Sequence, residues 1–198
     1  MRKANIAVLV SGGGTNLQAL LDAQAAGKLP HGQIVLVLSS SPRAYALERA
    51  KNAGIPGFSV ENPDFEGKLN ALLEAHQIDL VVLAGFLSIL SADFTEKWAN
   101  RIVNIHPSLI PSFCGAGMYG LKVHEAALQK GVKVTGATVH LVNEIPDGGE
   151  ILLQKAVEVL PGDTPEVLQK RVMEQAEWVL LPQAVEQLAE KITKETEK

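Results

Sequence analysis

The chain has 198 residues, 46% of them hydrophobic and 20% charged, which is typical of a globular protein that forms one domain with a sizeable core. The formal net charge of −4 argues against binding duplex nucleic acid through the overall field, although a local pocket can still hold a small anion. One cysteine excludes an intramolecular disulfide, and the apolar runs are too short for a signal peptide or a membrane span, so we expect a soluble, cytoplasmic protein.

The first half of the chain alternates short apolar runs with amphipathic segments. The apolar runs predict buried strands at residues 6–10, 34–38, 57–60, 80–84 and 102–105. Helical spacing of apolar residues predicts helices at residues 16–26, 44–53, 65–75 and about 91–99. Strands without polar alternation, separated by helices, indicate a parallel sheet covered on both faces. The predicted fold class is therefore α/β, with a Rossmann-like, mostly parallel sheet.

The second half of the chain changes character. A loop is expected at residues 109–120 and a helix at 123–130, followed by alternating segments at 135–142 and 151–160 that predict antiparallel strands. A long helical pattern covers residues 164–188, and Pro182 within it predicts a kink or an end at Leu181. The charged tail at residues 190–198 is expected to fray. No repeat or linker divides the chain, so we expect a single domain over residues 1–198.

A glycine-rich loop, Ser11-Gly12-Gly13-Gly14-Thr15-Asn16, joins the first predicted strand to the first predicted helix. Glycines let the backbone approach an anion closely, and the helix N-terminus supplies free N–H groups, so the loop predicts a phosphate site; a mere tight turn is the alternative. Thr15 or Asn16 could also cap the helix. The motif lacks the features of a Walker loop and of a dinucleotide fingerprint, which favours a phosphate monoester. Arg101, just before the fifth strand, could add charge there or be a solvated surface residue.

The fifth strand carries an amide and an imidazole two residues apart, Asn104 and His106, and Pro107 must end the strand. Two polar side chains at the carboxyl end of a strand in an α/β sheet lie where such folds bind ligands. An amide donor beside an imidazole can stabilise an oxyanion and move a proton, although an ordinary solvent-facing strand end has the same pattern.

Two further segments could have a functional role or a purely structural one. Asp147-Gly148-Gly149 is a turn sequence, but near an imidazole its carboxylate would fix the tautomer and raise the imidazole pKa. A zinc site built from His106, His140 and Asp147 matches no metal motif, so we predict no metal. The apolar segment at residues 83–90 could form the wall of a flat aromatic binding site or simply pack in the core.

Together these segments resemble the phosphoribosylglycinamide formyltransferases, a family of folate-dependent transformylases of purine synthesis. The resemblance rests on residues 11–17, 83–86, 104–111 and 147–149, in order and over nearly the whole chain. It implies one formyltransferase domain with a phosphate-binding half at residues 1–100 and a catalytic and folate-binding half at residues 101–198. It also implies that the formyl group of 10-formyltetrahydrofolate passes to the amine of glycinamide ribonucleotide through a tetrahedral oxyanion.

The resemblance assigns roles to individual residues. Asn104 would donate to the oxyanion, His106 would stabilise it or shuttle the proton, and Asp147 would orient and charge His106. The implied phosphate contacts are Gly14, Thr15, Asn16 and Arg101. The implied folate contacts are Phe86, Leu87, Ser88, Ile89, Leu90, Leu141, Val142, Asn143 and Glu144. Glu177 and Pro107 would lie at the substrate's amine end; the spacing of Glu177 to Pro182 fits the family, but its spacing to Arg171 is one residue too long.

The sequence departs from the family at two places. Leu87-Ser88 replaces the usual Met-Arg, which would weaken folate affinity if that arginine contacts the cofactor's acidic tail. The loop at residues 112–118 differs from the commoner forms, and we interpret its Cys114 as a packing residue because nothing beside it activates a thiolate.

Three other functions share part of this pattern: a formyltetrahydrofolate deformylase, a methionyl-tRNA formyltransferase, and a non-catalytic nucleotide-binding module. The first usually adds a regulatory domain, the second needs a tRNA-binding domain and basic surface, and the third does not require the three polar residues together. The expected partners are therefore glycinamide ribonucleotide and a reduced folate, with no nucleic acid and no membrane, in a monomer or a homodimer.

Overall fold

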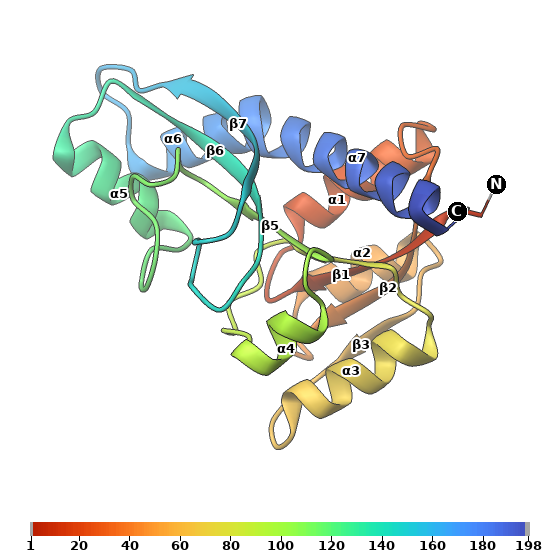
Figure 1. Ribbon diagram of the computed structural model, residues 1–198. Helices are drawn as coiled ribbons and strands as arrows, with labels where there is room; N and C mark the ends of the chain where they lie inside the picture. The colour runs from red at the N-terminus through yellow and green to blue at the C-terminus, as the bar shows by residue number, and fades with distance from the viewer. Residues whose placement is uncertain (1, 197–198) are drawn as a thin grey trace.

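The computed structural model describes residues 2–196, which form one seven-stranded sheet in the order β3-β2-β1-β4-β5-β6-β7 (Figure 1). The strands are β1 (Ala4–Val10), β2 (Gly32–Ser39), β3 (Gly57–Ser59), β4 (Leu80–Leu83), β5 (Ile102–His106), β6 (Val134–Leu141) and β7 (Ile151–Glu158). Strands β1 to β5 pair in parallel, whereas β6 is antiparallel to both β5 and β7. The predicted mostly parallel sheet with antiparallel strands in the C-terminal half is confirmed.

Helices cover both faces of the sheet because the central strands are apolar on both sides. The helices are α1 (Thr15–Ala25), α2 (Tyr45–Asn52), α3 (Phe65–Ala75), α4 (Ala92–Lys97), α5 (Leu121–Lys130), α6 (Pro165–Val172) and α7 (Trp178–Thr196), with a π-helical turn, η1 (Met173–Glu177), before α7. In β1, Ile6 and Val8 pack with α1, α2 and α7, while Ala7 and Leu9 pack with α3 and α4. This alternation is the two-residue period of a strand buried on both faces. No helix within residues 2–196 is both long and apolar enough to span a bilayer.

The last helix corrects two predictions. Helix α7 neither ends at Leu181 nor frays from residue 190, but continues through Pro182 to Thr196. Pro182 is the fifth residue of α7, so its missing N–H removes one intrahelical hydrogen bond near the start of the helix. Burial of the face that includes Val185, Leu188 and Ile192 offsets that loss. Residues 197–198 of the predicted tail lie outside the described part of the chain.

Candidate active site

Strand β5 brings Asn104 and His106 to one face of the sheet, near its carboxyl end. They alternate with Val103 and Ile105, which pack into the core on the opposite face. The strand ends at His106, where Pro107 follows it as predicted. His106 is 4% exposed and Asn104 is half-buried, so the sheet presents a sheltered amide and a sheltered imidazole side by side.

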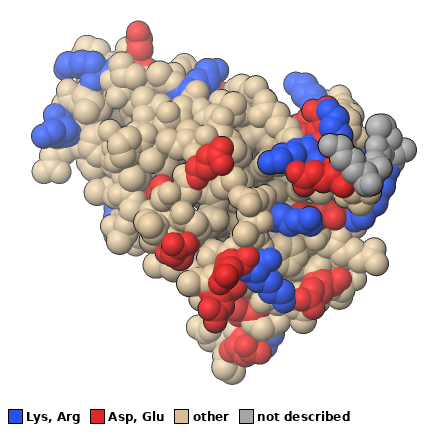
Figure 2. Space-filling view, in the orientation of Figure 1, with Lys and Arg blue, Asp and Glu red and all other residues tan. Residues whose placement is uncertain are grey.

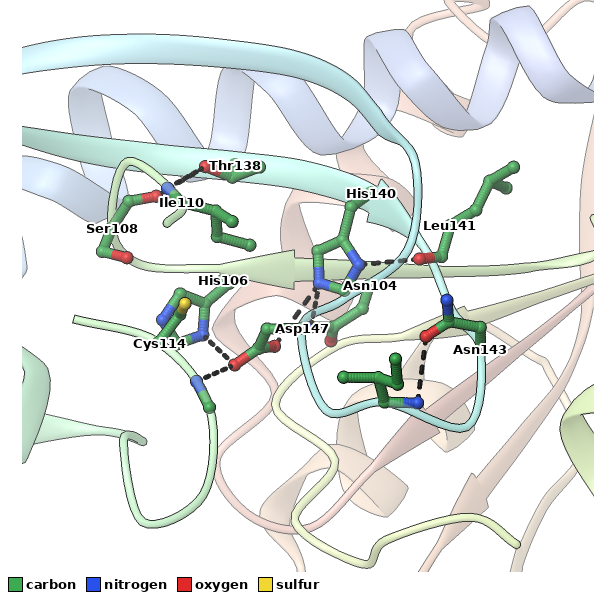
Figure 3. Close-up of polar contacts among 12 residues, drawn as sticks. Asn104, His106, Ser108, Ile110, Cys114, Thr138, His140, Leu141, Asn143 and Asp147 are labelled. Carbon is green, nitrogen blue, oxygen red and sulfur yellow. Dashed lines mark hydrogen bonds and ion pairs between the residues drawn. The ribbon is translucent and has the colours of Figure 1, made fainter. Parts of the chain in front are cut away.

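His140 on β6 joins this pair; sequence reasoning considered it only as a possible zinc ligand and not as a partner of Asn104. It lies directly opposite Asn104 in the antiparallel register. Its Nδ1 is 2.7 Å from the carbonyl oxygen of Leu141, which places the ring proton on Nδ1 and leaves Nε2 as an acceptor. The side-chain nitrogen of Asn104 donates to that Nε2 over 3.1 Å (Figure 3). His140 therefore orients the amide of Asn104 and leaves its second N–H free for another acceptor.

Asp147 lies between the two imidazole rings, as Figure 3 shows. Its carboxylate oxygens are 3.6 Å from Nδ1 of His106 and 3.5 Å from Nε2 of His140, and the amide of Gly115 donates to it over 2.8 Å. Burial alone would raise the pKa of Asp147, but the contacts from His140 and Gly115, together with the nearby His106 ring, hold the pKa below its ordinary value. Asp147 is therefore a carboxylate at neutral pH.

The turn that carries Asp147 is held close to the sheet. A Cβ atom at Gly149 would lie 1.8 Å from the carbonyl oxygen of Leu141, so only glycine lets the loop fold back on the end of β6. Asp147 itself has a φ of 56°, a left-handed conformation that aspartate tolerates better than most residues. The Asp-Gly-Gly sequence thus determines where the carboxylate lies, and Asp147 is half-buried.

The second ring nitrogen of His106 also faces an oxygen. Its Nε2 donates to the carbonyl oxygen of Phe113 over 2.9 Å, while Nδ1 faces the Asp147 carboxylate. An imidazole beside a carboxylate and an oriented amide N–H at one strand end can stabilise an oxyanion and exchange a proton with a substrate.

The glycine loop between β1 and α1 presents a row of backbone N–H groups. Helix α1 begins at Thr15, and Gly14 takes the left-handed conformation with a φ of 72°. The carbonyl oxygens of Gly12, Gly13 and Gly14 all accept hydrogen bonds, from Ala46, Arg49 and Gln18. The N–H groups of residues 12–16 have no acceptor among the described residues. Such a nest at a helix N-terminus is suited to an anion.

The expected cap of α1 is not formed by Thr15 or Asn16. The N-cap residue is Gly14, which has no side chain to cap the helix, and the side-chain amide of Asn16 donates to Glu177 over 2.7 Å. Glu177 is 6% exposed, and its burial raises the pKa to about 7, although the bond from Asn16 opposes the shift. The glycine loop is therefore in direct contact with a buried carboxyl group whose pKa is raised to about 7.

The π-helical turn explains the spacing of Glu177. The turn η1 covers Met173–Glu177, between Arg171 and Pro182. A π turn fits one more residue than an α-helical turn, and it lies in the stretch between Arg171 and Glu177 where the spacing is one residue too long. The extra residue is absorbed before Glu177, so Glu177 keeps its spacing to Pro182 and reaches Asn16.

Arg101 does not approach the glycine loop, contrary to the expectation. Its carbonyl oxygen accepts a bond from Val81, and β5 begins directly after it, at the amino edge of the parallel strands. The glycine loop follows Val10 at the carboxyl end of β1, so the length of the strands separates it from Arg101. The basic residue at the loop is instead Arg49 on α2, which donates to Gly13 over 2.8 Å.

The two segments expected to bind folate pack against the same buried cluster. Phe86 and Val142 both contact the cluster that includes Phe94 and Trp98, and Phe86 stacks on Phe65. The neighbouring side chains of Leu87, Ile89 and Ile145 are exposed. The amide of Leu87 donates to the Ser11 hydroxyl, which links this segment to the glycine loop. Exposed apolar groups of this kind could line the site of a flat ring.

The remaining predicted contacts lie in the same two segments. Ser88 is half-buried and Leu90 is buried in the first segment, while Leu141 and Asn143 are half-buried and Glu144 is exposed in the second. Figure 2 shows charges of both signs gathered around α3 and the end of α7, without a continuous basic surface on that face. Among residues 2–196, no group of three His, Cys, Asp or Glu side chains is arranged to hold a metal.

Cys114 lies close to Asp147 but has no activating partner. Its Sγ donates to the carbonyl oxygen of Pro111, and burial, together with the charge of Asp147, raises the pKa of the thiol. The thiolate, which is the nucleophilic form, is therefore disfavoured. This supports the interpretation of Cys114 as a packing residue.

Comparison with known proteins agrees with this geometry. A family model described as formyl transferase matches residues 4–185. The chain is 40% identical over 192 residues to phosphoribosylglycinamide formyltransferase of Haemophilus influenzae, covering 93% of this chain and 87% of that protein. It superimposes on a crystal structure of glycinamide ribonucleotide transformylase 1 from Symbiobacterium toebii with a TM-score of 0.88 and 40% identity, covering 96% of this chain and 89% of that chain.

The chain also matches part of larger animal proteins. It is 43% identical over 194 residues to the human trifunctional purine biosynthetic protein adenosine-3, covering 95% of this chain. It spans 18% of the length of that human protein and 14% of the related Drosophila melanogaster protein. The chain therefore belongs to the formyl transferase family, in the branch of the phosphoribosylglycinamide formyltransferases, as the motifs of its sequence predicted.

Proposed function

We propose that this chain transfers the formyl group of 10-formyltetrahydrofolate to the amine of glycinamide ribonucleotide, in the synthesis of purines. The observation that carries the proposal is the convergence of Asn104 and His106, both on β5, and Asp147, from the loop before β7, on the sheet edge that also carries the glycine loop. A phosphate-binding function alone would not explain the imidazole, and an oxyanion site alone would not explain the glycine loop. A transferase that acts on a phosphorylated substrate explains both.

The reaction requires one bond to form and one to break. The substrate amine attacks the formyl carbon, and the oxygen of that carbon becomes an oxyanion. The second N–H of Asn104 and the His106 imidazole are the groups that would stabilise this charge. The intermediate then collapses with cleavage of the bond to N10 of the folate, while the amine loses a proton and N10 gains one. His106 would carry that proton, and the Asp147 carboxylate would stabilise its charged form.

The ribonucleotide would extend from the glycine loop toward the imidazole. Its phosphate would accept bonds from the free N–H groups of residues 12–16. Asn16 and Glu177 lie directly beside this cradle, so they would contact the part of the same molecule next to the phosphate, whereas the glycinamide end would reach Asn104 and His106. The folate ring would lie against residues 86–90 and 141–144, where the apolar side chains of Leu87 and Ile89 are exposed. Neither a nucleic acid nor a membrane is an expected partner.

An assay with 10-formyl-5,8-dideazafolate tests this proposal. Loss of the formyl group is followed by absorbance, with and without glycinamide ribonucleotide, and the formylated ribonucleotide is measured directly. The proposal expects deformylation only when the ribonucleotide is present, with one formylated product for each formyl group lost. Equal turnover without the ribonucleotide would indicate a hydrolase, and the absence of turnover would indicate a binding module. Fractionation and sedimentation would test the expected cytoplasmic location and the monomeric or homodimeric state.

A further inference from the structure

We propose that Arg49 is a positioning residue of the phosphate cradle, which it sets by holding the peptide between Gly13 and Gly14 in one orientation. This inference rests on the proposed function of the glycine loop. Arg49 lies on α2, outside the loop itself, and no sequence motif in the loop points to it. Its Nε donates to the carbonyl oxygen of Gly13 over 2.8 Å.

The orientation of a carbonyl determines where the next N–H points. In a trans peptide the carbonyl and the following N–H point in opposite directions. The carbonyl of Gly12 accepts from the amide of Ala46 over 3.1 Å, and the carbonyl of Gly13 accepts from Arg49, so helix α2 holds both carbonyls on its own side. The N–H groups of Gly13 and Gly14 therefore point away from α2. A rotated Gly13–Gly14 peptide would instead aim a carbonyl oxygen at the phosphate.

The guanidinium group of Arg49 is itself held in place. Its Nη1 donates to the side-chain oxygen of Gln18 on α1 over 2.9 Å, and its Cζ lies 5.0 Å from the centre of the Tyr45 ring. Two donors in a fixed planar fork thus join the loop carbonyl to the first helix, which a lysine cannot reproduce. The positive charge also lies beside the loop, where it favours an anion on the other side of the backbone.

The backbone at this point needs an external support because glycines do not hold a conformation by themselves. Gly14 cannot be replaced by a stiffer residue, since a Cβ atom there would lie 2.7 Å from the Cβ of Ala46 and the residue has a positive φ. The close packing against α2 therefore requires a flexible glycine in the loop, and the hydrogen bond from Arg49 to Gly13 restricts the conformation of the loop.

The test compares two neighbouring cations of α2. Arg49→Gln removes the fork, whereas Lys51→Gln removes the same charge from a side chain that is 78% exposed. With the folate substrate saturating, we expect Arg49→Gln to raise the KM for glycinamide ribonucleotide about ten- to a hundredfold, which is the loss of a charge-assisted hydrogen bond. The kcat should change little because Asn104 and His106 are untouched, and Lys51→Gln should resemble the wild type. Arg49→Lys should restore only part of the affinity, because it keeps the charge without the fork.

A second readout separates positioning from general damage. Amide hydrogen exchange of residues 13–16 should slow when inorganic phosphate is added to the wild type and to Lys51→Gln, but not to Arg49→Gln at the same concentration. If Arg49→Gln does not fold, Gln18→Met removes the acceptor that orients the guanidinium, together with an exposed hydrogen bond from Gln18 to Asp22, and it should raise the same KM several-fold.

The outcomes distinguish this inference from the proposed function. A KM within twofold of the wild type for Arg49→Gln, or for Gln18→Met where that variant decides, would overturn the role of Arg49. Full recovery in Arg49→Lys, or an equal rise in Lys51→Gln, would also overturn it, since charge alone would then suffice. A wild-type enzyme whose rate does not depend on glycinamide ribonucleotide would instead overturn the proposed function.

Discussion

Glu177 should make the stability of this protein depend on pH in a way that a single substitution removes. Burial raises the pKa of Glu177 to about 7, from an ordinary value of 4.5. Between these two values the folded protein keeps a proton on Glu177 that the unfolded chain has lost. The folded state binds more protons, so its stability must fall as the pH rises through this window. The difference of 2.5 between the two pKa values corresponds to about 3 kcal/mol.

The assay is urea unfolding at pH 5 and pH 8, followed by tryptophan fluorescence, on the wild type and Glu177→Gln. Glutamine keeps an oxygen that can accept from Asn16, so the two proteins should have similar stability at pH 5. At pH 8 the variant should gain about 3 kcal/mol relative to the wild type, because only the wild type must bury a charge. Other titrating groups cancel in this comparison, since both proteins contain them.

Glu174 provides a matched control on the same π-helical turn. Its exposed side chain lies 3.3 Å from Lys170, and Glu174→Gln should show no comparable gain between pH 5 and pH 8. A difference between Glu177→Gln and the wild type that is the same at both pH values would refute the reasoning, because Glu177 would then have the same pKa in the folded and unfolded chains.

Three further predictions concern the site and its surroundings. Asn104→Ala should lower turnover by about 10²–10³ with a smaller change in KM, because it removes one oxyanion donor, and unchanged activity in steady-state kinetics would contradict that role. In urea unfolding, His124→Leu should have a higher free energy of unfolding than the wild type at pH 5, and this advantage should be about 2 kcal/mol larger than at pH 8. Burial and the nearby His106 lower the pKa of His124 to about 4, so the wild type loses stability as the pH falls below about 6.5, and an equal difference at both pH values would count against this. Ser88→Arg should tighten folate binding in a fluorescence titration, and an unchanged Kd would show that the missing arginine makes no contact with the acidic tail.

Local pattern in the sequence was enough to predict the elements that carry the chemistry. Apolar runs and helical spacing are properties of neighbouring residues, so the parallel sheet and the position of the glycine loop follow from them. The two-residue period of a strand put Asn104 and His106 on one face, and Pro107 placed them at its end. Resemblance to a family then supplied the reaction, which spacing alone could not.

Contacts between distant segments were decided only by the tertiary structure. The antiparallel register of β6 puts His140 opposite Asn104, and the folded-back glycine turn brings Asp147 between two imidazoles. Neither arrangement has a local signal, because strand register depends on how whole elements pack. Which arginine lies at the glycine loop was likewise not predictable from the sequence. Arg101 begins a strand at the opposite edge of the sheet, whereas Arg49 reaches the loop from α2, because parallel strands begin at one edge and end at the other.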